Sequence, residues 1–166
     1  MKSKELDEKV LEAYTAFLER QIEKSTELCI IALEQCIKYN YNRGIGGCYY
    51  LNANIYSRNK EWNKALQAAE KALWHFEQIE ERLFQAHLLY RIAYFHSQME
   101  ENTTAFEKCK KALEEFQALE DKKGEAGAYS LLGTIFIQKA EYENALEHLE
   151  KSFSLTIRQN NLDRAG

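Results

Sequence analysis

Four cysteines and four histidines are the side chains in this 166-residue sequence that could bind a metal ion or act as a nucleophile. The cysteines form no C-x-x-C pair, and no histidine has a histidine or cysteine four residues away, the spacing that places two ligands on one helical face. Helix-forming residues surround the cysteines, where small apolar side chains suit a core, so we expect packed free thiols. A metal or redox site is the alternative. The residues are Cys29, Cys36, Cys48, Cys109, His75, His87, His96 and His148.

The carboxylates do not form a pattern typical of a catalytic site. They lie in runs such as EQIEER and ENALEHLEK, which are typical of a solvated helix face. The sequence also contains no glycine-rich phosphate loop, no H-E-x-x-H pair and no nucleophile elbow. We therefore expect a protein that is not an enzyme and that uses neither a metal nor a cofactor.

Charge and the N-terminal segment bear on partners and location. The net charge is −4, which gives no basic field to attract nucleic acid or anionic lipid. The opening MKSKELDEKVLEAY has no apolar core of a signal peptide, and no later stretch reaches the ~20 apolar residues of a membrane-spanning helix. We expect a soluble, cytoplasmic protein with neither nucleic acid nor membrane as a direct partner. The sequon at Asn102 is then a chance match.

The composition predicts an all-α fold. Proline is absent, glycine occurs only seven times, and helix-forming residues dominate. In the segment WNKALQAAEKALWHF the apolar residues recur at the i, i+3, i+4, i+7 spacing of one helical face. They are Ala65, Leu66, Ala69, Ala72, Leu73 and Phe76.

The chain repeats itself every 40 residues. The tripeptide K-A-L occurs at 71–73 and again at 111–113, and other positions recur with the same period. Two columns contain only small residues, as expected where two helices of one repeat cross closely. The first column is Ala13, Ala53, Ala93 and Gly133, and the second is Ser25, Ala65, Ala105 and Ala145.

Each repeat is predicted to contain a helix A, a tight turn, a helix B and a polar connection. In the second copy we expect helix A at Gly46–Arg58, the turn at Asn59–Glu61 and helix B at Trp62–Ile79. The connections YNYNRG, EERLFQ, EDKKGE and NNLDRA should end each helix B. The expected repeats are 3–42, 43–82, 83–122 and 123–162, within one domain spanning 1–166.

These columns resemble the tetratricopeptide repeats, in which Leu-Gly/Ala and an aromatic residue in helix A precede an aromatic residue and spaced alanines in helix B. The resemblance covers the whole chain, most weakly in the first copy. A 40-residue period without proline, instead of the common 34 residues, resembles the long-helix subclass of spindle-orientation adaptors and bacterial sensor or regulatory proteins. The matching residues are Tyr129, Leu132, Gly133, Phe136, Tyr142, Ala145 and Leu149 in copy four, and Tyr49, Ala53, Tyr56, Trp62, Ala65, Ala69 and Ala72 in copy two.

The resemblance implies a right-handed superhelical solenoid of about four repeats, in which helix A lines a concave groove. Tyrosine rings, an amide and cations on that wall would suit a peptide, although tyrosines at helical spacing also serve as packing. Gly47 and Gly127 would allow close approach of a ligand backbone, at a cost in helix stability. The predicted groove residues are Tyr50, Asn54, Arg58, His87, Tyr90, Arg91 and Tyr94.

Two functional hypotheses follow. The first is a protein-interaction module that binds a peptide or partner segment in the groove, as part of a regulatory or adaptor protein. The second is a structural, dimerisation or autoregulatory sensor domain in front of an output domain such as a cyclase, a kinase or a DNA-binding unit. The two differ in whether the inner wall is occupied from outside the protein.

The end of the chain falls at the start of a repeat. In register, Gly166 lies 40 residues after Ala126, so residues 163–166 would begin a fifth repeat. We therefore expect an N-terminal fragment of a longer protein. We also expect a partly bare apolar face on the last helix, open to self-association.

Overall fold

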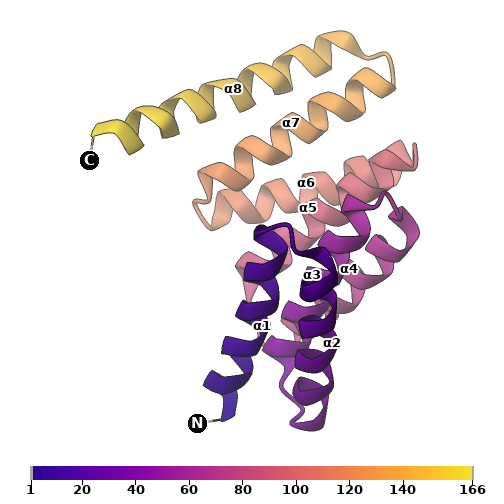
Figure 1. Cartoon of the computed structure of the whole chain (residues 1–166). Helices are drawn as coiled ribbons and strands as arrows, with labels where there is room; N and C mark the ends of the chain where they lie inside the picture. Colours follow the sequence, from indigo (N-terminus) through magenta and orange to yellow (C-terminus); the bar gives the residue numbers. More distant parts are fainter. Residues whose placement is uncertain (1, 166) are drawn as a thin grey trace. The chain divides into compact units, whose positions relative to one another are not determined.

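Eight α-helices and no β-strand make up the described part of the chain, residues 2–165, in the computed structural model (Figure 1). Side chains are described as far as residue 160. Helix starts recur every 40 residues, which confirms the predicted repeat. The helices are α1 (Lys2–Leu18), α2 (Ile22–Lys38), α3 (Asn42–Arg58), α4 (Trp62–Glu77), α5 (Arg82–Gln98), α6 (Asn102–Ala118), α7 (Lys122–Gln138) and α8 (Tyr142–Ala165).

All seven turns between helices use one backbone motif. Every twentieth residue has a positive φ, and none of these residues is glycine. At the first turn the amide of Arg20 donates to the Phe17 carbonyl and that of Gln21 to the Ala16 carbonyl, the Schellman pattern that ends a helix. The same two bonds recur at the other six turns. The positive-φ residues are Arg20, Asn40, Lys60, Glu80, Glu100, Glu120 and Ala140.

The predicted helix boundaries and connections need four corrections. Helix A of the second copy begins at Asn42 instead of Gly46, and its helix B ends at Glu77 instead of Ile79. The segment NNLDRA is not a connection, because the backbone of α8 stays helical through it to Ala165. Finally, the connections between copies are the same short turn as the one inside each copy.

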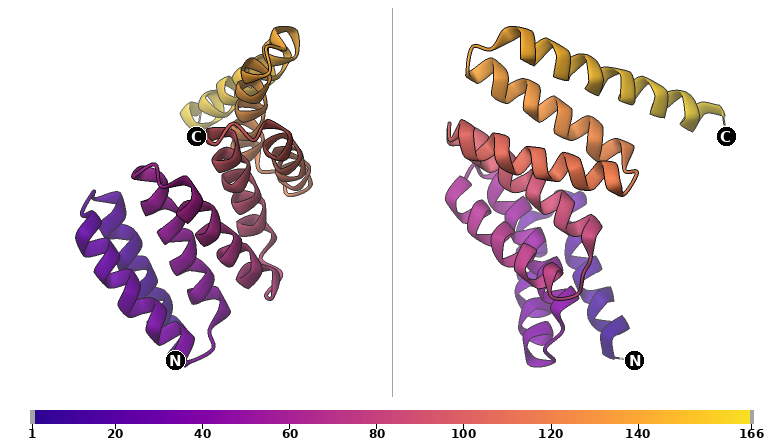
Figure 2. Two further views of the ribbon diagram at one scale, coloured as in Figure 1. Left: turned by 90° about the vertical axis from the view of Figure 1, so that its right-hand side faces the viewer. Right: turned by 180° about the vertical axis from the view of Figure 1, so that it is seen from behind.

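The structure divides into two compact units, and each is described by itself. Unit 1 is Met1–Glu81 and contains α1 to α4; unit 2 is Arg82–Gly166 and contains α5 to α8. In unit 1, α1 packs on α2, α2 on α3 and α3 on α4, and unit 2 repeats this order with α5 to α8. Both views in Figure 2 show α7 and α8 as an antiparallel pair.

The small columns lie where the helices of a repeat cross. Ala13 and Ser25 are fully buried, and the Ser25 hydroxyl donates to the Ala13 carbonyl at 2.8 Å. A Cβ on Gly133 would lie 2.7 Å from the Leu149 side chain. The lack of a side chain at Gly133 therefore makes room for Leu149 in the last repeat. The crossing therefore selects small residues, as the columns predicted.

The odd-numbered helices, called A helices from here on, lie on the inner side of each unit. Helix α1 contacts α3 directly and α5 contacts α7, whereas no comparable contact joins the even-numbered B helices α2 and α4, or α6 and α8. Closer spacing of the A helices means that they form the inside of the curve in each unit.

No helix among the described residues combines the length and the apolar character that crossing a membrane requires.

Candidate functional site

The predicted groove residues divide between the two units. Three of them lie on α3 in unit 1, and four lie on α5 in unit 2. All are on A helices, as the sequence predicted. The α3 residues are Tyr50, Asn54 and Arg58, and the α5 residues are His87, Tyr90, Arg91 and Tyr94.

In unit 1 an exposed cation lies next to aromatic rings. The Arg58 guanidinium lies over the Phe17 ring, 6.0 Å from its centroid, and Phe17 lies 6.1 Å from Tyr14 by ring centroids. Tyr50 is half-buried. Asn54 is only 8% exposed, which leaves little of its amide open to a partner. Of this group, Arg58 is the residue that solvent reaches most freely.

In unit 2 the half-buried Tyr90 and Tyr94 lie one helical turn apart on α5. Burial raises the pKa of Tyr90, and the hydroxyl therefore stays protonated at neutral pH and can donate a hydrogen bond. The Tyr94 ring packs against Phe95 at 5.9 Å, and the Arg91 guanidinium lies 5.5 Å from the Phe95 centroid. Phe95 is fully buried and so fixes the position of both neighbours.

His87 is bound within unit 2 by two neighbours. Its Nε2 lies 3.4 Å from Asp121 Oδ2, and its ring meets the Phe116 ring edge-on at 5.0 Å. Burial lowers the pKa of His87, and the Asp121 carboxylate opposes that shift. Asp121 also accepts the Gly124 amide at 3.0 Å and so caps α7. These contacts favour a positioning role for His87 at the α7 N-terminus.

The two inner-wall glycines differ in how their neighbours pack. A Cβ on Gly47 would lie 3.1 Å from Val10 Cγ1, so the close packing of α1 and α3 explains this glycine. A Cβ on Gly127 would meet nothing in unit 2 closer than the Tyr90 ring at 3.8 Å, which is ordinary van der Waals contact. Gly127 also lines a hollow of ≈ 310 Å³ between α7 and α8. Unit 2 therefore has room for a methyl group at position 127, although the residue there is glycine.

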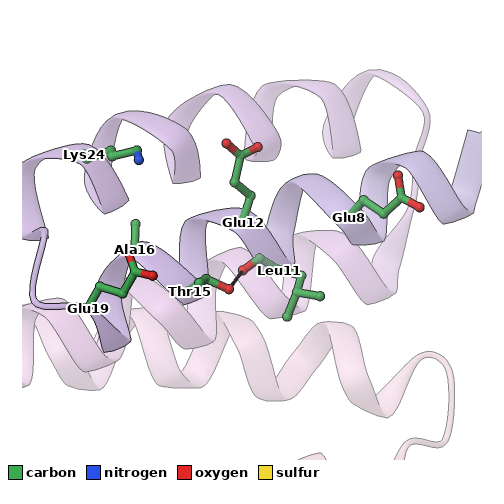
Figure 3. A pocket seen from close by; sticks show the side chains of 7 residues that line it. All are labelled: Glu8, Leu11, Glu12, Thr15, Ala16, Glu19 and Lys24. Carbon is green, nitrogen blue, oxygen red and sulfur yellow. Dashed lines mark hydrogen bonds between the residues drawn. The ribbon is translucent and has the colours of Figure 1, made fainter.

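A hollow of ≈ 380 Å³ at the start of unit 1 is rimmed by charge (Figure 3). Glu8 and Glu12 of α1, Glu19 in the turn that follows α1, and Lys24 of α2 surround it, and the Thr15 hydroxyl donates to the Leu11 carbonyl at 2.9 Å. In register these α1 positions correspond to the α3 surface that packs on α2. Charged residues thus solvate the outer face of the first repeat.

Three of the four cysteines meet between α2 and α3, which the sequence analysis did not predict. All four are free and buried, which confirms the prediction of packed thiols. The Cys29 thiol donates to the Cys48 carbonyl at 3.5 Å, and hydrogen bonding with Cys48 lowers the pKa values of Cys29 and Cys36 and raises that of Cys48. The seven-residue spacing of Cys29 and Cys36 was the available sign of a shared face. Cys109 repeats the position of Cys29 and donates to the Ala128 carbonyl at 3.3 Å.

Comparison with known proteins agrees with this architecture. Residues 84–157 match the tetratricopeptide repeat family. No curated protein sequence matches the chain.

Several solved structures share the fold. BtubC (BKLC) from P. vanneervenii has a TM-score of 0.82 at 14% identity, over 93% of this chain and 64% of its own. A signal transduction ATPase with a tetratricopeptide repeat sensor from Pyrococcus horikoshii has a TM-score of 0.82 at 20% identity, over 96% of this chain and 25% of its own. The apo form of RapI has a TM-score of 0.75 at 16% identity, over 92% of this chain and 43% of its own.

This chain thus spans less than two thirds of each of these three proteins. The likeness at these identities concerns the fold. Together with the family match of residues 84–157, the 40-residue helical hairpin and the small residues at its crossings show that the chain has the all-α repeat fold of tetratricopeptide repeat proteins.

Proposed function

We propose that the chain is a protein-interaction module that binds a peptide or a segment of a partner protein along its A helices, within a larger regulatory or adaptor protein. The tetratricopeptide fold is typically a non-catalytic interaction or sensor module. The residues proposed to contact the partner are Tyr50, Asn54, Arg58, His87, Tyr90, Arg91 and Tyr94.

The pairing of Gly127 with Tyr90 carries this proposal. A glycine inside a helix costs about 1 kcal/mol relative to alanine, and packing within unit 2 does not require one at this position. The missing side chain leaves the α7 backbone open beside an aromatic ring. A partner's main chain could approach there while its apolar side chain packs on Tyr90.

The charges at the site favour a partner with a carboxylate. Arg58 is exposed, and its position over the Phe17 ring holds the guanidinium in place. A guanidinium binds a carboxylate with two parallel hydrogen bonds. For the α3 residues of unit 1, the proposed partner segment therefore carries an acidic side chain.

Selection from a displayed library of random peptides, followed by affinity measurement on the full chain, tests the proposal. We expect Tyr90→Ala and Arg58→Ala each to weaken binding at least fivefold, which is about 1 kcal/mol. Gly127→Ala should also weaken binding although it adds only a methyl group. The matched control is Trp74→Ala, because Trp74 is an exposed aromatic residue on the B helix α4.

Two outcomes would count against the proposal. One is a selection that yields no peptide, and the other is a set of peptides whose affinity responds to Trp74→Ala and not to the A-helix changes. Circular dichroism of each variant separates lost binding from lost folding.

The alternative function is a structural or autoregulatory sensor element in front of an output domain such as a cyclase, a kinase or a DNA-binding unit. It is favoured by the likeness to a signalling ATPase in which a tetratricopeptide sensor is one part of a longer chain. In that case another segment of the same protein fills the A-helix face. A peptide that binds this chain alone and fails to bind the longer protein would favour the alternative.

A further inference from the structure

Two cysteines of unit 1, Cys29 on α2 and Cys48 on α3, lie in direct contact. The Cys29 thiol donates to the main-chain carbonyl of Cys48 at 3.5 Å, and its Sγ also lies 3.4 Å from Oδ1 of the half-buried Asn52. Both cysteines are free and almost fully buried, at 1% and 0% exposed. The proposed binding along the A helices does not use either thiol.

The third copy of the repeat makes the same contact without a second thiol. Cys109 lies two 40-residue periods after Cys29, is fully buried, and donates to the carbonyl of Ala128 at 3.3 Å. Ala128 in turn lies two periods after Cys48. Alanine therefore satisfies the packing and the carbonyl contact at this position, and the thiol of Cys48 is not needed for either.

Cys29 is the thiol of this contact that is suited to react with an oxidant. Hydrogen bonding with Cys48 lowers the pKa of Cys29 against the opposing effect of burial, which increases the fraction of thiolate, the reactive form. The Asn52 amide can also turn its NH₂ group towards a thiolate. Hydrogen bonding with Cys48 lowers the pKa of Cys36 as well, but the nearby Asp7 carboxylate opposes that shift.

We propose that Cys29 and Cys48 form a reversible disulfide when the protein meets a peroxide. The Cys29 thiolate attacks one oxygen of hydrogen peroxide, the O–O bond breaks, and a sulfenic acid and a hydroxide ion form. The hydroxide takes up the proton that Cys29 released. The Cys48 sulfur then attacks the Cys29 sulfur, the S–S bond forms, and the sulfenic hydroxyl leaves with the Cys48 proton as water. The two thiols are thus oxidised, and the peroxide is reduced to two molecules of water.

The disulfide joins α2 to α3 across the turn at Asn40. Its two cysteines are 19 positions apart, so the bond closes a loop that contains the end of α2 and the start of α3. Such a cross-link stabilises a fold, because it restricts the unfolded chain. A dithiol such as dithiothreitol reverses the bond by thiol–disulfide exchange. Oxidation would therefore strengthen the α2–α3 contact in unit 1.

Peptide mass spectrometry of the full chain after treatment with hydrogen peroxide and alkylation of the remaining thiols in denaturant tests the proposal. We expect a disulfide-linked pair of peptides that contain Cys29 and Cys48, and dithiothreitol should remove it. Cys109 is the internal control, because burial raises its pKa to about 12 and no second thiol occupies position 128. Its free thiol should be lost at least about tenfold more slowly than that of Cys29.

Two substitutions exchange the residues of the two copies. Cys48→Ala gives α3 the residue that α7 has at Ala128, so the variant should fold and should form no disulfide at Cys29. Ala128→Cys places a second thiol beside Cys109 and should create a disulfide between positions 109 and 128. Circular dichroism checks that both variants are folded.

Three outcomes would overturn the proposal. The first is equal loss of the Cys29 and Cys109 thiols. The second is a disulfide that joins Cys48 to Cys36 instead of Cys29. The third is a cross-link that forms only after urea has unfolded the chain, because the reaction would then not depend on the contact between α2 and α3.

Discussion

Gly124 and Gly127 lie one turn apart on α7, and we predict that replacing each with alanine has opposite effects on stability. A Cβ on Gly124 would overlap Phe116 Cδ1 and would lie 2.6 Å from Phe116 Cγ, well inside van der Waals contact. Phe116 is 1% exposed and packs against His87, so its ring has no free space to move into. At Gly127 the nearest atom lies at 3.8 Å.

The magnitudes follow from overpacking and helix propensity. Forcing a methyl group into a packed core costs about 1–3 kcal/mol, and a glycine in the first turn of α7 gains less than ~1 kcal/mol on replacement. Gly124→Ala should therefore lower the free energy of unfolding by about 1–2 kcal/mol. Gly127→Ala should raise it by about 0.5–1 kcal/mol, because the added methyl group fits and the helix gains propensity.

Urea unfolding followed by circular dichroism measures both effects. The double variant Gly124→Ala/Phe116→Leu supplies the control, because a smaller side chain at 116 should relieve part of the clash with the new methyl group. The coupling between the two sites should be about 1 kcal/mol. If Gly124→Ala proves as stable as Gly127→Ala, the packing of Phe116 against the α7 backbone is not as described.

Two further predictions concern the turns and pH. Ala140 has a φ of 59°, which is strained for alanine, so Ala140→Gly should raise the free energy of unfolding by about 0.5–1 kcal/mol. Asn40→Gly should change the free energy of unfolding less, because asparagine tolerates its φ of 52°. Thermal unfolding of the two variants compares these values. Burial lowers the pKa values of His75 and His87 below the ordinary 6.5. The stability of the fold with neutral rings is therefore fully present above pH 6.5, and it is lost as the pH falls through the lowered pKa values of the folded protein. Urea unfolding at pH 7.5 and 5.5 should show this loss, and the variant His75→Gln/His87→Gln should show less of it.

The 40-residue period made the helical hairpins predictable, because close helix crossings leave few residue choices. Ala13 and Ser25 were recognisable as small residues from their columns alone. The period did not indicate that the Ser25 hydroxyl donates to the Ala13 carbonyl, because the other copies have alanine at the same position. Sequence periodicity thus predicts the size of the residues at a helix crossing, but it does not predict the hydrogen bonds that they make.

The helix starts were harder to predict, because few of them carry the usual signals. At α7 the side chain of the N-cap residue Asp121 accepts a hydrogen bond from the helix backbone. The N-cap residues of α2, α3, α4 and α6 make no such side-chain bond. Gly44 was interpreted as part of a connection, yet it lies inside α3. A Cβ there would lie within van der Waals overlap of Cys36 Sγ. This glycine serves packing instead of ending a helix.

The predicted turn at Asn59–Glu61 is confirmed, but the sequence did not identify the residue with positive φ in each turn. Glycine is the usual residue at a left-handed helix end, but these turns use residues such as Lys60 and Ala140. Polar composition alone therefore did not distinguish a turn inside a repeat from one between repeats.

For the candidate site, the sequence placed the predicted residues on A helices, which the structure confirms. The sequence could not rank these residues by their exposure to a partner, because the exposure of each side chain depends on how the neighbouring helices pack. Gly47 and Gly127 share one column, and only the contact of Gly47 with Val10 on α1 separates a packing glycine from an open one. His87 likewise acquires its contact with Asp121 only in the fold.

The proposed interaction along the A helices is tested most directly by mapping a selected peptide on the isotope-labelled chain by amide chemical shifts in NMR spectra. We predict that the largest shifts fall on α3, α5 and α7, with Tyr90 and Gly127 among the most affected residues and the B helices α2 and α4 nearly unchanged. Shifts concentrated on the exposed residues of α2 and α4, around Trp74, would contradict the account.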